Sequence, residues 1–156
     1  MTIILQHSRG AELNRVEYRG PISLAEMHAL GDYQVKHPDW RTYDFFNLIT
    51  PGTDFDAVSP QALEEFVEKY RVLFDPMELL IFRRAAWICQ SPRAQALLNH
   101  WVSQRNVRQG QTQDVRVFTD FDEAALWLAL PPSKGATLES GKGFKQVALY
   151  NLPTAV

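Results

Sequence analysis

The chain has 156 residues, of which 46% are hydrophobic and 22% charged, and its formal net charge at pH 7 is −2. This length suits one domain with a single core. The small net charge excludes a protein whose whole surface is shaped for nucleic acid or anionic lipid, so we expect no nucleic-acid partner. The single cysteine, Cys89, cannot form an internal disulfide, and no apolar run is long enough to span a membrane. We therefore expect a cytoplasmic protein.

The first half of the chain alternates strand-like and helix-like segments. Val16 and Tyr18 alternate with charged residues, which predicts that residues 13–19 pair in a hairpin with one face in water. Pro residues and possible capping residues separate the later segments. The predicted elements are strands at 3–7 and 13–19, a helix starting after Ser23, a buried strand at 43–49, a loop at 50–59 and a helix at 60–74.

In the second half, the apolar run at 79–89 reads as the buried central strand, and a helix follows at 91–106. A strand at 115–119 and a short helix capped by Asp120 come next. Residues 133–143 are rich in Gly, Ser, Thr and Lys, which is typical of a flexible linker. Residues 144–152 are apolar again, so this tail packs either on its own domain or on a second subunit as a possible homodimer.

These elements predict an α/β fold with a mixed, mostly parallel five-stranded sheet in the order ββαβαβαβα, followed by a C-terminal extension. We divide the chain into a domain at 1–132 and a linker with an apolar tail at 133–156. The strand order implies right-handed crossovers, with the first strand antiparallel at one side of the sheet.

Several segments resemble the SpoIIAA-like group of STAS-related proteins over residues 3 to 130. They are Gly20-Pro21-Ile22-Ser23, Phe46-Asn47-Leu48, Arg84-Ala85-Ala86-Trp87-Ile88, Val117-Phe118-Thr119-Asp120 and Glu123-Ala124-Ala125-Leu126-Trp127-Leu128. The resemblance implies a non-catalytic regulatory module that binds a protein partner in bacterial regulation. Related modules hold lipids, which implies an alternative function as a carrier or sensor of a small apolar ligand.

The chain departs from the resemblance at two positions that matter for function. The regulators carry an Asp-Ser-Ser-Gly phosphorylation motif at a helix start, and here the loop at 50–59 lacks it, so we expect Thr50, Thr53 and Ser59 to be unmodified. Asn47 stands where the family's strand often carries Asp.

Arg83 and Arg84 are the most informative polar residues because neighbouring strand positions point to opposite faces, both expected to be covered. At least one guanidinium therefore needs an exit at a strand end or a partner, either an acid such as Asp44 or Asp75 or an anionic ligand at a cleft. With apolar walls, an arginine anchor would suit a fatty-acid-like ligand. The hypothetical ligand site comprises Arg83, Arg84, Phe46, Phe66, Tyr70 and Trp101, although aromatic residues at such spacings also form ordinary core.

Other chemistry has no support in the sequence. The four histidines have no metal-ligand spacing, no nucleophile motif is present, and the glycines around Lys142 lack P-loop spacing. We therefore predict no catalytic residue, no metal site and no cofactor.

Overall fold

The computed structural model describes residues 2–77, 83–107 and 113–153. Strands and helices alternate along the chain, as predicted, and η marks short 3-10 helices. The order is β1 (Thr2–Ser8), β2 (Leu13–Arg19), α1 (Leu24–Lys36), η1 (Pro38–Thr42), β3 (Asp44–Ile49), α2 (Pro60–Phe74), η2 (Asp75–Met77), β4 (Arg83–Cys89), α3 (Pro92–Val107), β5 (Gln113–Phe118), α4 (Phe121–Trp127), η3 (Pro132–Lys134), α5 (Gly135–Ser140) and β6 (Lys145–Tyr150). Residues 79–82 of the predicted central strand lie outside the described residues.

The strands form one mixed sheet in the order β5-β4-β3-β2-β1-β6. Neighbouring strands from β2 to β5 pair in parallel. β1 runs antiparallel to both β2 and β6. The predicted mixed, mostly parallel sheet is therefore confirmed, but it has six strands rather than five because the apolar tail adds β6.

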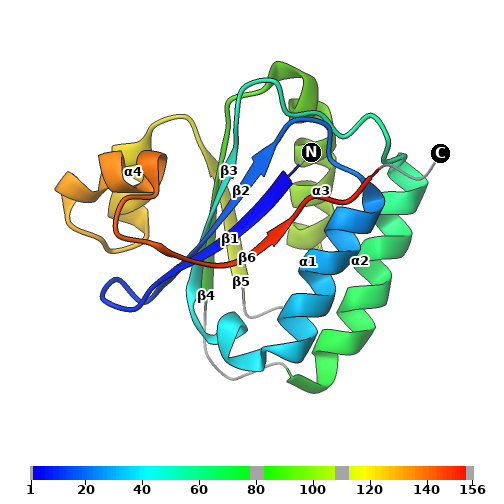
Figure 1. Cartoon of the computed structure of the whole chain (residues 1–156), viewed down its shortest axis with the longest axis horizontal. Coiled ribbons are helices and arrows are strands. Elements are labelled where there is room, and N and C mark those ends of the chain that lie inside the picture. Colours follow the sequence, from blue (N-terminus) through cyan, green and yellow to red (C-terminus); the bar gives the residue numbers. More distant parts are fainter. Residues whose placement is uncertain (1, 78–82, 108–112, 154–156) are drawn as a thin grey trace.

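Helices cover both faces of this sheet (Figure 1). α1, α2 and α3 lie on one face, and α4 and α5 lie on the other. The larger core lies under α1 to α3 and includes Trp87 and Leu98, and Leu98 is only 1% exposed. The smaller core joins β3 and β4 to Ala124 and Leu138 of the opposite layer. β4 is buried on both faces, as its apolar sequence predicts.

The helix starts follow the capping residues of the sequence. Ser23 accepts a hydrogen bond from the Glu26 amide, and the Glu26 carboxylate accepts one from the Ser23 amide, which completes a capping box. Ser59 caps α2 and Asp120 caps α4. In the described part of the chain, no helix is long and apolar enough to cross a membrane.

Two expectations fail because the chain after Pro132 packs on the sheet. Residues 133–143, predicted as a linker, instead hold η3 and α5, and Leu138 of α5 is fully buried. The face of β2 predicted to be in water carries Arg15 and Glu17, and both are buried. Because the apolar tail pairs with β1, the polar segment at 133–143 before it is also held against the sheet. Composition alone does not reveal this.

Candidate functional site

Arg83 and Arg84 lie on opposite faces of β4, as strand geometry predicts. Arg83 is buried, and its Nη1 donates to the Arg41 carbonyl at 2.6 Å. Arg84 Nη1 donates to the Trp127 carbonyl at 3.0 Å on the other face. Asp44 accepts from the Arg84 backbone amide at 2.7 Å rather than from its guanidinium. The two guanidinium groups therefore form hydrogen bonds on opposite faces of the sheet.

The aromatic members of the predicted ligand site are also divided by the sheet. Phe66, Tyr70 and Trp101 belong to the core under α1 to α3, whereas Phe46 belongs to the core under α4 and α5. The Phe66 and Trp101 rings meet edge to face with centroids 6.3 Å apart. All four side chains are buried in contact with other core residues, as in ordinary packing.

Tyr70 has a polar role where α2 meets α1. Its hydroxyl oxygen lies 2.7 Å from Asp32 Oδ1 and 2.8 Å from the His28 carbonyl. Burial, together with the Asp32 carboxylate, raises the pKa of the Tyr70 hydroxyl well above its ordinary value. The hydroxyl therefore stays protonated and holds the two helices together.

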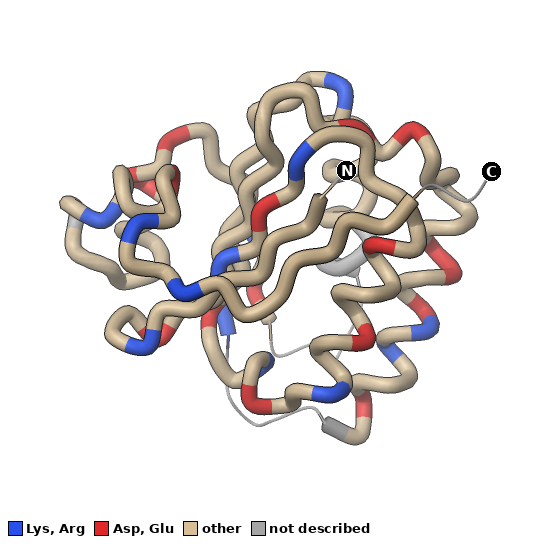
Figure 2. The backbone as a smooth tube through the Cα atoms, in the orientation of Figure 1, with Lys and Arg blue, Asp and Glu red and all other residues tan. Residues whose placement is uncertain are grey.

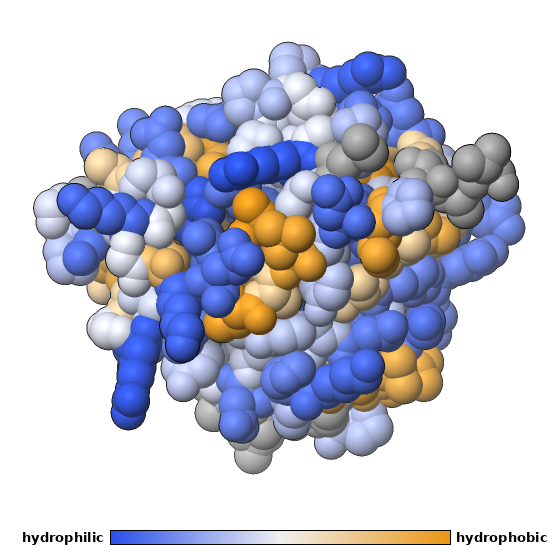
Figure 3. Space-filling view, viewed as in Figure 1, coloured by the Kyte–Doolittle hydropathy of each residue, from blue (hydrophilic) through white to orange (hydrophobic). Residues whose placement is uncertain are grey.

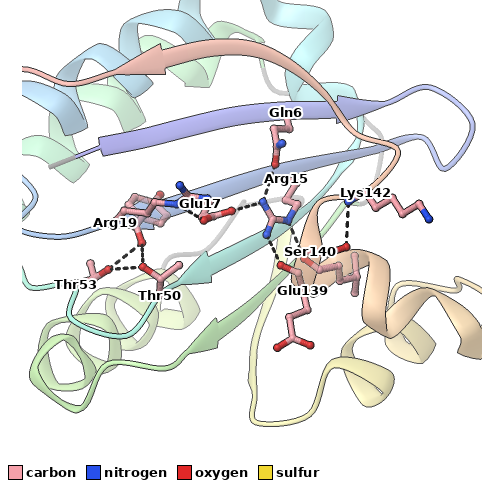
Figure 4. Close-up of polar contacts among 11 residues, drawn as sticks. Gln6, Arg15, Glu17, Arg19, Thr50, Thr53, Glu139, Ser140 and Lys142 are labelled. Carbon is pink, nitrogen blue, oxygen red and sulfur yellow. Dashed lines mark hydrogen bonds and ion pairs between the residues drawn. The ribbon is translucent and has the colours of Figure 1, made fainter.

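The loop between β3 and α2 uses its hydroxyls for structure. Thr50 and Thr53 both donate to the Tyr18 carbonyl, at 2.8 and 2.9 Å, and Thr53 is fully buried (Figure 4). Ser59 is exposed, and its Oγ accepts from the Ala62 amide at 3.1 Å as the cap of α2. Phosphorylation of Thr53 would require the loop to open, while Ser59 is accessible. The absence of phosphate at these residues stays a prediction.

A buried ion network connects β2 to α5 (Figure 4). Arg15, 1% exposed, donates to the Glu17 carboxylate at 2.5 Å and to Gln6 Oε1 at 2.6 Å. It also donates to the carbonyls of Leu138 and Glu139, each at 2.8 Å. Those carbonyls lie near the end of α5, where they lack helical partners. Arg15 therefore fixes α5 to the sheet.

Glu17 sits between Arg15 and Arg19 and accepts hydrogen bonds from both. Burial alone raises its carboxyl pKa, but the hydrogen bonds and positive charges of Arg19 and Arg15 together outweigh that effect and lower the pKa below its ordinary value. Glu17 is therefore charged while buried. No motif pointed to this network, and the only signal in the sequence is the charge alternation on β2.

The tail strand β6 pairs with β1 on one side and forms an edge of the sheet. Leu152, just after it, donates its amide to Glu26 Oε1 of α1 at 3.1 Å. Val147 and Leu149 are nevertheless 40% and 49% exposed. In the view of Figure 3, β6 is on the side facing the reader, and apolar side chains gather at the centre of this face. We call Val147, Leu149 and the backbone edge of 146–150 the β6 edge.

The fold and these contacts define an α/β protein with a mixed sheet and an exposed apolar edge. Among the described residues, no three His, Cys, Asp or Glu side chains are grouped so that they could hold a metal ion. No family model, curated protein or solved structure matches the chain.

Proposed function

We propose that this chain is a non-catalytic, cytoplasmic interaction module of regulatory type that binds a protein partner by strand addition at the β6 edge. The observation that carries the proposal is the exposure of Val147 and Leu149 on the terminal strand of the sheet. An edge strand offers unpaired backbone groups, and apolar side chains beside them favour a second strand.

The two edges of the sheet differ in charge. β5, at the other edge, carries Asp114 and Arg116, and charged side chains protect an edge from pairing. β6 has a charge only at its first residue, Lys145, and none from there to Tyr150 (Figure 2). Charge therefore favours the β6 edge over β5 as the place where a strand is added.

A second copy of the chain is the partner that this edge fits. If two β6 strands pair antiparallel about a two-fold axis at Ala148, Val147 of each copy lies opposite Leu149 of the other. Cross-strand apolar pairs of this kind stabilise a sheet by roughly 0.2–1 kcal/mol each. Such a dimer would continue one sheet across both subunits.

Sedimentation velocity of the full chain with matched variants tests the proposal. We expect a concentration-dependent dimer, and we expect Leu149→Lys to weaken it at least tenfold because the lysine places charge in the new interface. Leu126→Lys is the control, since Leu126 is 68% exposed on α4 and lies outside the β6 edge. A full chain that remains monomeric at roughly 300 µM, or a dimer equally weakened by both variants, contradicts the proposed self-pairing.

A further inference from the structure

A small cavity lies between the β1–β2 hairpin and the α5 region, and none of its lining residues belongs to the β6 edge. Its volume is about 120 Å³. The hairpin contributes one wall, and α5 with the following turn contributes another. Ser8, Ala11 and Leu13 line the cavity from the hairpin, and Thr137, Leu138 and Phe144 line it from the α5 side.

The lining combines an apolar interior with positive charge at the solvent side. Leu13 and Leu138 are buried, and Leu130 and Phe144 are partly buried around the same space. Lys134 and Lys142 also line the cavity, and both residues are exposed. None of the lining residues is acidic, and neither ammonium has a hydrogen-bond or ion-pair partner among the described residues. The cavity is therefore suited to an anion with an apolar body.

The walls of the cavity are held in place before any ligand arrives. Arg15 binds the carbonyl of Leu138, which fixes the α5 wall to the sheet. Gly141 ends α5 with φ of 75° and donates its amide to the Thr137 carbonyl. A wall fixed in advance lowers the ordering cost of binding.

We propose that this cavity binds a small monocarboxylate with an apolar body of about four carbons, as in pentanoate. A cavity of roughly 150 Å³ holds benzene, so 120 Å³ takes a slightly smaller body. The carboxylate then lies at the lysines, where charge-assisted hydrogen bonds are available. The site lies away from Arg83 and Arg84, and it does not depend on the proposed partner binding.

Nuclear magnetic resonance titration of the ¹⁵N-labelled full chain with straight-chain carboxylates from acetate to heptanoate tests both parts of the proposal. Affinity is expected to rise about fourfold per methylene while the chain fills the cavity, and to stop rising beyond about five carbons in total. Pentanamide, which lacks the charge, should bind about tenfold more weakly than pentanoate. The amide signals of Thr137 and Gly143 should shift most, which locates the site.

Variants separate the site from nonspecific binding. Lys134→Gln combined with Lys142→Gln should weaken pentanoate binding about three- to tenfold, whereas Lys36→Gln on α1 should leave it unchanged. Thr137→Leu should abolish binding by filling the cavity. Any of three results overturns the proposal: no binding at roughly 50 mM pentanoate, equal binding of pentanamide, or inorganic phosphate binding as tightly as pentanoate with the same shifts.

Discussion

Glu17 is a carboxylate that the fold removes from water and keeps charged. Its two arginine partners differ, because Arg15 is buried with it whereas the Arg19 side chain is 59% exposed. Removing one member of a buried pair costs more than the pair itself contributes, since the other charge then lacks a partner. The network is therefore more important for the position of α5 than for net stability.

Glu17→Gln should lower the free energy of unfolding at pH 7 by about 3–5 kcal/mol, because it leaves the Arg15 guanidinium buried without its counter-charge. The folded-state pKa of Glu17 lies below the ordinary value near 4.5, so its stabilisation is present above that pH and is lost as the pH falls through the folded pKa. Urea titrations should show that the difference in unfolding free energy between the natural chain and Glu17→Gln becomes smaller in acid. The exposed Glu65→Gln is the control, and a gap that widens in acid contradicts the assignment.

Gly31 allows α1 and α2 to approach closely. A Cβ at this position would lie 2.3 Å from Cζ of Tyr70. Gly31→Ala adds about 1 kcal/mol of helix propensity, but crowding of the buried ring costs about 1–3 kcal/mol. We expect net destabilisation in the natural chain and stabilisation in a Tyr70→Ala background, measured as a double-mutant cycle in urea. If Gly31→Ala changes the unfolding free energy with the same sign in both backgrounds, crowding by Tyr70 is not the cause of the destabilisation.

At the scale of the element, α5 is too short to be stable alone, so its environment must define it. Leu138 is buried in the smaller core against the sheet, and Arg15 of β2 binds the carbonyls of Leu138 and Glu139. Gly141 completes the end of the helix in the left-handed region that glycine favours.

Gly141→Ala should destabilise the protein more than Gly143→Ala or Gly10→Ala. These two changes separate the strain of the left-handed backbone from the contact with Arg15. Gly141 has φ of 75°, and a Cβ there would lie 3.2 Å from Nη1 of Arg15. Gly143→Ala introduces left-handed strain at φ of 83° with nothing within 4 Å, and Gly10→Ala is open to solvent. Thermal melts should rank the losses as Gly141, then Gly143 at about 1–2 kcal/mol, then Gly10 within 0.5 kcal/mol. Equal losses at 141 and 143 would show that contact with Arg15 is unimportant.

At the scale of the whole molecule, residues 133–153 close the domain. β6 covers the outer side of β1, and α5 covers part of the sheet opposite α1 to α3. The tail also returns to α1 through the bond from Leu152 to Glu26. Residues 133–153 therefore contact both helical layers, α1 through Leu152 and the opposite layer through α5.

A chain ending at Pro132 should lose at least about 3–5 kcal/mol of unfolding free energy, because it loses the Leu138 packing and the carbonyl partners of Arg15. Circular dichroism in urea measures the loss. Adding a peptide of residues 133–153 should restore part of the stability by mass action. If the shortened chain keeps its full stability, the tail is not part of the core.

The sequence by itself determined the alternation of strands and helices, the two-sided burial of β4 and the starts of three helices. These features follow from apolar periodicity and capping side chains within a few residues. Tertiary structure alone decided where residues 133–153 pack, because a short strand gains stability only from the edge it meets. It also placed Arg15 and Glu17 in the interior, since the α5 carbonyls that bind Arg15 come from more than 100 positions away along the chain and Glu17 is buried as the partner of Arg15. The predicted ligand residues were separated for a related reason: positions adjacent on a strand, such as Arg83 and Arg84, belong to different layers once helices cover both faces.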